Sequence, residues 1–146
     1  YMHNPYSSMY TYTASVLKVI DGDTIEVDFD LGFGVWLRKQ RIRLEGIDTP
    51  ESRTTDKEEK IRGILSKEKL KEVLLKDKYI YVQTKLDPNE KFGRILAKIS
   101  TPSGIEVNQW MISNYYAVAY QGENKEKVKE LHLANAKILK AKGELK

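Results

Sequence analysis

The fold is decided by residues 16–29, which read VLKVIDGDTIEVDF. Two alternating apolar runs flank Asp21 and Gly22, and an Asp-Gly pair between such runs is the strongest short-range signal of a β-hairpin. Asp23 has the parity of the apolar residues in the second run, so the pleat directs its carboxylate toward the apolar side of the hairpin. A carboxylate directed inward needs a polar partner.

Three further alternating segments extend this hairpin into a sheet. Residues 35–44 follow a second turn at 30–34 and predict a third strand, which completes a meander. Residues 79–84 and 94–99 predict a fourth and a fifth strand, joined by a loop at 87–93. In the third strand we expect one face to carry the apolar residues Trp36, Ile42 and Leu44, and the other Arg41 and Arg43.

Helical composition follows the third strand and returns near the C-terminus. Between residues 56 and 76 the apolar spacing slips by one step after Leu65. We therefore expect a helix over 66–75 with Ser66 as its N-cap, and a mobile or separate charged segment over 53–60. We expect a short helix over residues 107–115 and a final helix over residues 124–142. The apolar face of the final helix would carry Val128, Leu131, Leu133, Ile138 and Leu139.

This order of elements predicts an α+β fold. Five strands, with one helix after the third and two more toward the C-terminus, fit a five-stranded β-barrel of the oligonucleotide/oligosaccharide-binding (OB) type. We expect one domain over residues 12–146, preceded by a polar, tyrosine-rich leader over residues 1–11. A fold of this type does not by itself define a function.

The composition restricts the possible chemistry. The chain has 146 residues, no cysteine and two histidines, so thiol chemistry is excluded and a Ser-His-Asp triad is hard to build. Its 25 Lys and Arg against 21 Asp and Glu give a net charge of +4, which is compatible with a phosphate-bearing partner. No apolar run approaches membrane-spanning length, so we expect no membrane partner, and we expect a monomer. The location stays open between a secreted mature form and a cytoplasmic protein.

Residues 43–51, which read RLEGIDTPE, concentrate the polar chemistry of the chain. They hold the guanidinium of Arg43 and the carboxylates of Asp48 and Glu51, and Pro50 restricts the backbone between the two acids. An arc of carboxylate and backbone oxygens suits Ca²⁺ or Mg²⁺. The alternative interpretation is an ordinary turn before a helix, because proline and acidic residues favour a first helical turn.

Three motifs in this order resemble the staphylococcal nuclease (thermonuclease) family. They are Ile20-Asp21-Gly22-Asp23-Thr24, the run from Arg43 to Glu51, and Lys91-Phe92-Gly93-Arg94 followed by Ile95-Leu96-Ala97. The resemblance covers roughly residues 12–142. It implies an OB-fold nuclease that uses Ca²⁺, with Mg²⁺ possible, to hydrolyse DNA and RNA with little sequence preference, leaving 3'-phosphate ends.

The resemblance also implies roles for individual residues. Asp23 and Asp48 would bind the metal through carboxylates, and Thr49 through its carbonyl oxygen. Glu51 would position and deprotonate the attacking water. Two arginines, Arg43 and Arg94, would hold the scissile phosphate. The substrate-binding positions would be Lys91, Phe92 and Tyr120.

Two positions depart from the family pattern. Phe92 stands where the family usually has a tyrosine, so the ring is kept and the hydroxyl donor is lost. Gly122 stands where a second tyrosine often follows the one at Tyr120. Because stacking of a base on an aromatic ring contributes about 1–3 kcal/mol, we expect altered substrate affinity with catalysis retained.

Each site residue also has a structural alternative. Asp23 could complete a turn, Arg43 could be solvated, and Asp48 could cap a turn. Glu51 could be a helix-start acid, and Arg94 could form a surface ion pair with Glu90 or Asp87. If those alternatives held together, the chain would be a catalytically silent barrel that binds nucleic acid or protein. Preference for DNA or RNA, and endonucleolytic or exonucleolytic cleavage, are left open.

Overall fold

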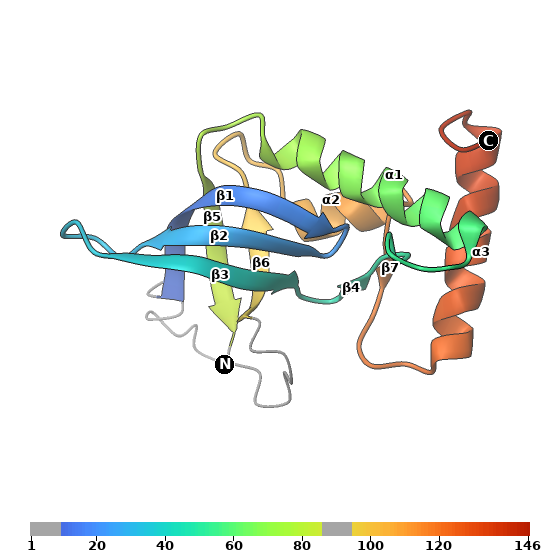
Figure 1. The fold of residues 1–146 in the computed structure, drawn as a ribbon, viewed down its shortest axis with the longest axis horizontal. Helices are drawn as coiled ribbons and strands as arrows, with labels where there is room; N and C mark the ends of the chain where they lie inside the picture. Colours follow the sequence, from blue (N-terminus) through green and yellow to red (C-terminus); the bar gives the residue numbers. More distant parts are fainter. Residues whose placement is uncertain (1–9, 86–94) are drawn as a thin grey trace, which may run out of the picture.

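The computed structural model describes residues 10–85 and 95–146 of the chain. Five strands close into a barrel in the order β1-β2-β3-β6-β5 (Figure 1). They are β1 (Thr11–Asp21), β2 (Thr24–Asp30), β3 (Trp36–Leu44), β5 (Ile80–Lys85) and β6 (Ile95–Ser100). Three helices, α1 (Lys57–Leu74), α2 (Val107–Ser113) and α3 (Lys125–Ala141), lie outside the barrel. This is the OB-type barrel with three helices that the sequence predicts.

The hairpin at Asp21 and Gly22 is confirmed. Strands β1 and β2 pair antiparallel with Asp21 opposite Thr24, and β2 pairs antiparallel with β3. The barrel closes because β3 pairs in parallel with β6, while β6 and β1 both pair with β5. This closure leaves the end of β3 beside the start of β6, and the polar residues that follow β3 lie at that edge of the barrel.

The barrel interior holds the apolar residues that alternate along the strands. Ile25 and Val27 of β2 and Ile42 and Leu44 of β3 are fully buried. Helices α1 and α2 contribute further buried residues, namely Leu70, Val73, Leu74, Val107 and Met111. The inward parity expected for β2 is therefore confirmed, and Asp23 continues it at the strand's end.

The first helix is longer than predicted, and the expected boundary at Ser66 is wrong. Helix α1 begins after Asp56, whose carboxylate accepts the N–H groups of Glu58 and Glu59 and caps the helix. Ser66 is buried in the middle of the helix and its hydroxyl donates to the carbonyl oxygen of Tyr116 at 2.6 Å. The apolar spacing misled the prediction because small residues, Gly63 and Ser66, form the inward face of the first turns.

The expected apolar faces of the third strand and of the final helix are also wrong. Trp36 is 38% exposed, because β3 extends past the barrel and its register against β2 shifts between Val27 and Phe29. In α3, the buried residues are Val128, His132, Ala136 and Leu139, whereas Leu131, Leu133 and Ile138 are exposed. The predicted apolar face mixed two sides of the helix.

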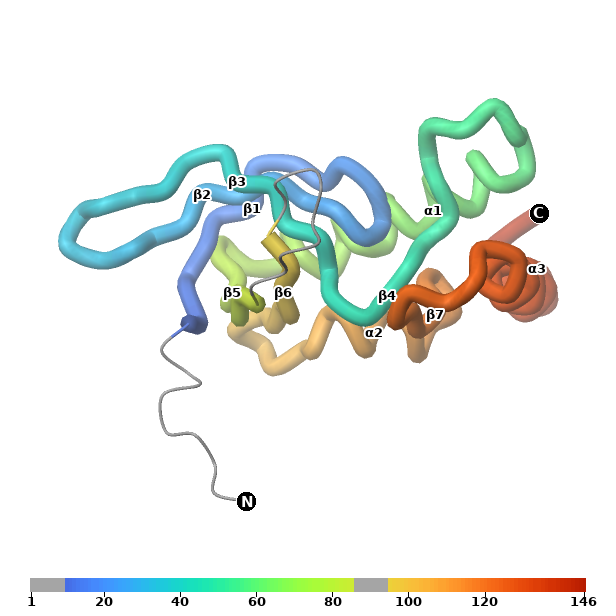
Figure 2. Tube along the Cα trace, turned by 90° about the horizontal axis from the view of Figure 1, so that it is seen from below, coloured from blue at the N-terminus to red at the C-terminus, as the bar shows by residue number. Residues whose placement is uncertain are grey.

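A short sheet that the sequence did not predict fixes the segment after β3. Strand β4 (Ile47–Asp48) pairs antiparallel with β7 (Val118–Ala119), and the Tyr120 N–H donates to the Gly46 carbonyl at 2.8 Å. Figure 2, which turns the molecule by 90°, shows that this sheet lies between the barrel and α3, while the β2–β3 hairpin extends away at the opposite end.

Some predicted features lie outside the described residues. These include residues 1–9 of the expected leader and the expected loop at 87–93. Strand β1 begins at Thr11, inside the range expected for the leader. No helix within the described ranges is long and apolar enough to cross a membrane.

Candidate active site

Arg43 is the centre of a small charged cluster where β2 begins and β3 ends. Its Nη2 lies 3.6 Å from Oδ2 of Asp23 and 3.6 Å from Oδ1 of Asp48. Its Nη1 donates to the carbonyl oxygens of Leu44 at 3.3 Å and Ile47 at 3.2 Å, so main-chain acceptors fix the guanidinium. Three predicted site residues, Asp23, Arg43 and Asp48, therefore meet at one point.

The backbone explains why these residues meet. The Leu44 N–H donates to the Asp23 carbonyl at 2.8 Å, which ties the end of β3 to the residue before β2. Gly46, at φ +78°, then reverses the chain, a conformation that glycine adopts without steric cost. The reversal leads directly into β4 and places Asp48 opposite Asp23 across the Arg43 side chain.

Asp23 is buried, and its carboxylate is only loosely paired. Burial raises the pKa of Asp23 above its ordinary value, with the nearby charge of Asp48 adding to the effect, while the positive charge of Arg43 opposes it. Its contact with Arg43, at 3.6 Å, is longer than a hydrogen bond, and the Thr24 hydroxyl, at 3.0 Å, is a neutral donor. A further cation nearby would stabilise the ionised form of a buried carboxylate that lacks a close charged partner.

His132 was missed by the sequence analysis. It lies on α3, it is 9% exposed, and its Nε2 is 2.7 Å from Oδ2 of Asp48. Because an ionised carboxylate can only accept, the ring donates this hydrogen bond. Asp48 thus has one oxygen held by His132 and the other turned toward Arg43. A histidine far away in the sequence gives no local signal of such a contact.

Glu51 is an exposed residue on the segment between β4 and α1. Its N–H donates to Oε2 of Glu59 at 3.2 Å, and the next residue, Ser52, is anchored by its N–H and hydroxyl on Oδ1 of Asp21. Helix α1 packs on this segment at Gly63, where a Cβ would overlap the Glu51 carbonyl group. Glu51 precedes the helix, whose first-turn acids are Glu58 and Glu59, so it is not a helix-start acid.

A cleft of about 370 Å³ opens beside this cluster. Its walls come from the β4–α1 segment, from the first half of α1 and from α3. Its lining residues include Asp48, Thr49, Glu51, Tyr120 and His132. The Arg43 guanidinium also lies over the Tyr120 ring, 5.8 Å from its centre, which brings the predicted aromatic residue to the same place.

The residues present can accommodate a hard cation. Among the described residues, no group of three or more His, Asp or Glu side chains is arranged to hold a metal ion. The available donors are therefore the pair of carboxylates from Asp23 and Asp48, supplemented by main-chain carbonyl oxygen and water. Such a sparse oxygen set is compatible with Ca²⁺ or Mg²⁺, which both retain water ligands. The raised pKa of Asp23 is consistent with a carboxylate placed for a charge that only a ligand supplies.

Three of the predicted site residues cannot be placed. Lys91, Phe92 and Arg94 lie outside the described residues, as do Asp87 and Glu90, the expected ion-pair partners of Arg94. Gly122 lies in the turn before α3 and adopts φ +92°. A tyrosine at this position would be strained by that positive φ.

Fold and site together define the class: a small OB-type barrel with an arginine between two carboxylates at its rim. The Staphylococcal nuclease homologue family model matches residues 41–145, and the chain belongs to this family. It is 32% identical over 121 residues to "Endonuclease YhcR" of Bacillus subtilis, covering 80% of the chain and 10% of that protein. It is 34% identical over 113 residues to an "Uncharacterized endonuclease" of Escherichia coli, covering 77% of the chain and 64% of that protein. The chain thus spans less than two thirds of each relative.

Proposed function

We propose that the chain is a metal-dependent endonuclease that hydrolyses phosphodiester bonds of DNA and RNA with little sequence preference. The observation that carries this proposal is the placement of Arg43 between Asp23 and Asp48, at 3.6 Å from each, beside a cleft that Glu51 lines. Family membership supports it, and so do the relatives' names as endonucleases.

The chemistry requires groups of this kind. A phosphodiester resists attack because its oxygens already carry negative charge, so cationic groups must neutralise the charge that grows in the transition state. The planar fork of Arg43 can bond two phosphate oxygens and stays charged. Arg94 is the second candidate for this role by its place in the sequence.

A bound Ca²⁺, or Mg²⁺, would supply further positive charge and acidify a water molecule. Asp23 and Asp48 would hold the metal through carboxylates and Thr49 through its carbonyl oxygen. His132 would keep the Asp48 carboxylate oriented, since hydrogen bonds to a metal ligand fix its direction.

Glu51 would orient the attacking water and accept its proton. The water oxygen adds to phosphorus, the bond from phosphorus to the 5' oxygen breaks, and the leaving oxygen takes a proton from solvent. The products are a 3'-phosphate and a 5'-hydroxyl. A carboxylate is a weak base, so Glu51 would act mainly by positioning the water. Tyr120, and Lys91 and Phe92 of the loop, would contact the substrate.

The test is degradation of single-stranded DNA, double-stranded DNA and RNA with Ca²⁺, with Mg²⁺ and with a chelator. Glu51→Gln should lose about 10²- to 10³-fold in rate while keeping its melting temperature. Glu130→Gln, an equal change of charge at an exposed position of α3, should behave as wild type. If wild type binds nucleic acid but cleaves nothing with either ion, the chain is instead a silent OB-fold binding module.

A further inference from the structure

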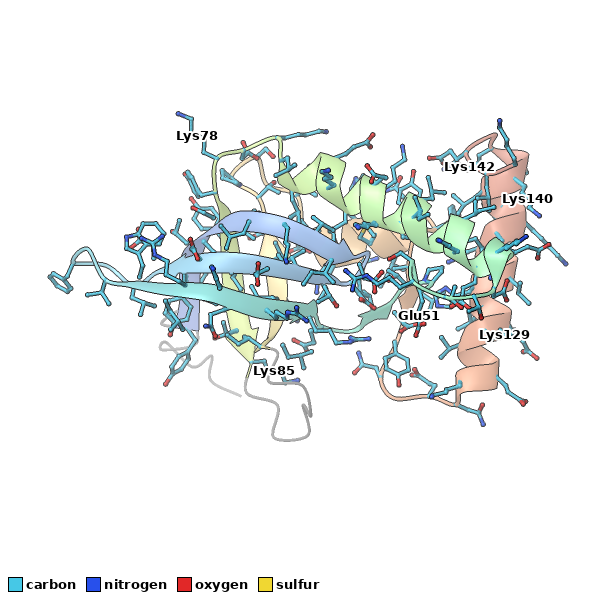
Figure 3. All side chains as sticks on the ribbon, viewed as in Figure 1. Glu51, Lys78, Lys85, Lys129, Lys140 and Lys142 are labelled. Atoms are coloured by element: carbon cyan, nitrogen blue, oxygen red, sulfur yellow. The ribbon has the colours of Figure 1, made fainter. Side chains whose placement is uncertain are left out.

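The cleft beside Glu51 is lined by more than the residues assigned above. Its far walls carry three basic side chains, Arg62 from α1 and Lys125 and Lys129 from α3. Figure 3 shows Glu51 on the segment before α1 and Lys129 on the part of α3 that faces it. Acidic residues also line the cleft, so the sign of its charge depends on which groups are already paired.

The acidic groups of the lining are mostly engaged within the protein. The Asp56 carboxylate caps α1, and the Glu59 carboxylate accepts the Glu51 N–H at 3.2 Å. Asp48 accepts from His132 at 2.7 Å and faces Arg43. These contacts hold three of the carboxylates in place, and the cleft is lined by four carboxylates, those of Asp48, Glu51, Asp56 and Glu59, together with the three basic side chains.

The basic groups of the lining are not engaged in this way. Across residues 10–85 and 95–146, Arg62, Lys125 and Lys129 have no carboxylate within 4.0 Å, in contrast to Arg43. The Nε of Arg62 is buried and has no hydrogen-bond partner among the described groups. A buried donor without a partner is unfavourable by about 1–3 kcal/mol, and more for a charged group. The three basic side chains thus line the cleft without a carboxylate partner among the described residues.

We infer that this basic wall, Arg62 with Lys125 and Lys129, binds a second phosphate group of the substrate chain, next to the phosphate that is cleaved. The inference rests on the proposed function, because Glu51 and the wall share one cleft. A guanidinium and two ammonium groups suit a phosphodiester oxygen, and arginine can bond two oxygens at once. The wall would hold the nucleic acid across Glu51 and favour substrates with more than one phosphate.

Binding is measured in chelator, so that no cleavage occurs, with a fluorescent single-stranded DNA of about 10 nucleotides, within the range of OB-fold site sizes. The double variant Arg62→Gln/Lys129→Gln removes two charges from the wall. The matched control, Lys60→Gln/Lys137→Gln, removes two charges from exposed positions of the same helices. Fluorescence anisotropy is followed over a range of salt concentrations.

The wall variant should raise Kd about tenfold or more, as expected when charge-assisted hydrogen bonds are removed. It should also lower the slope of log Kd against log salt by about 0.7 for each phosphate that the variant no longer neutralises. Arg62→Lys keeps the charge and should retain most of the slope. If the wall variant and the control variant give the same Kd and slope, the inference is wrong.

A second measurement separates this inference from the proposed function. An aryl ester of a single nucleotide, which carries one phosphodiester, should be hydrolysed with unchanged kcat/KM by the folded wall variant. A loss on this substrate equal to the loss on the oligonucleotide would place Arg62 and Lys129 in the cleavage step and overturn the inference. If wild type cleaves neither substrate, the proposed function fails, whatever the salt slopes show.

Discussion

Asp23 directly precedes β2 and Asp28 lies within it, near the β2–β3 turn, and the carboxylates of the two residues have different surroundings. At the hairpin end, the Lys39 N–H donates to Asp28 at 2.9 Å and Arg38 Nη1 donates at 3.0 Å. The hydrogen bond from the Lys39 N–H, with help from Arg38, lowers the pKa of Asp28 below its ordinary value. At the site end, burial raises the pKa of Asp23, and its one contact with Arg43 is 3.6 Å long.

The difference shows how one stretch of the chain serves two purposes. Asp28 has partners at hydrogen-bond distance from its own hairpin, so it stabilises that hairpin. Asp23 shares Arg43 with Asp48, so one cation faces two carboxylates and all three keep bonding capacity. Incomplete pairing of buried charge is unfavourable for folding and is typical of functional sites.

The largest effect is expected when the arginine beside each aspartate is replaced by alanine. Arg43→Ala should lower the rate of DNA cleavage by about 10²- to 10³-fold, because it removes a donor that stabilises the transition state. Arg38→Ala, the matched change at the hairpin end, should leave the rate within about twofold of wild type. Initial rates on DNA with Ca²⁺ or Mg²⁺ check both, and equal losses would contradict the proposed distinction.

The next test concerns the support of Asp48 by α3. His132→Ala should weaken Ca²⁺ binding by about 10- to 100-fold, the usual effect of losing a hydrogen bond to a metal ligand. His132→Gln keeps a donor and should recover part of the affinity. Titration calorimetry measures the Kd, and Leu133→Ala, at an exposed neighbouring position, serves as control. An unchanged Ca²⁺ affinity in His132→Ala would show that Asp48 needs no support.

Replacing Asp23 tests whether its buried charge reduces stability. Asp23→Asn should raise the free energy of unfolding at neutral pH, in chelator, by about 0.5–2 kcal/mol, because it removes a desolvated carboxylate and leaves Arg43 paired with Asp48. Urea denaturation followed by tryptophan fluorescence measures the change. A destabilised variant would mean that the pairing of Asp23 with Arg43 outweighs the effect of burial.

The smallest effect is expected from the acid titration of Asp28. Because its folded pKa is lowered, its stabilising contribution is present above the ordinary value of 3.8 and is lost as pH falls through the folded pKa. Asp28→Asn should therefore be less stable than wild type at neutral pH, and the difference should shrink as pH falls below about 4. Urea denaturation at a series of pH values measures it. A difference that does not vary with pH would rule out the titration of Asp28 as its source.

Much of the fold was predictable because it depends on local patterns. The Asp-Gly turn between alternating runs defined the first hairpin, and the parity of Asp23 with Ile25 placed its carboxylate correctly on the inward side. Helix α1 was mispredicted because its inward face uses Gly63 and Ser66, which carry no apolar signal. The contact of Gly63 with the Glu51 segment explains why a small residue lies there.

The sequence by itself determined the five barrel strands, their order along the chain and the identity of the charged residues at the rim, since alternation and turn chemistry act over a few residues. Only the tertiary structure decided which charges share a partner. His132 reaches Asp48, and Ser66 reaches Tyr116, across long separations in the chain. Burial then raises the pKa of one carboxylate, while a hydrogen bond from the Lys39 N–H lowers that of another. Those effects depend on distance and desolvation in space, and sequence spacing encodes neither.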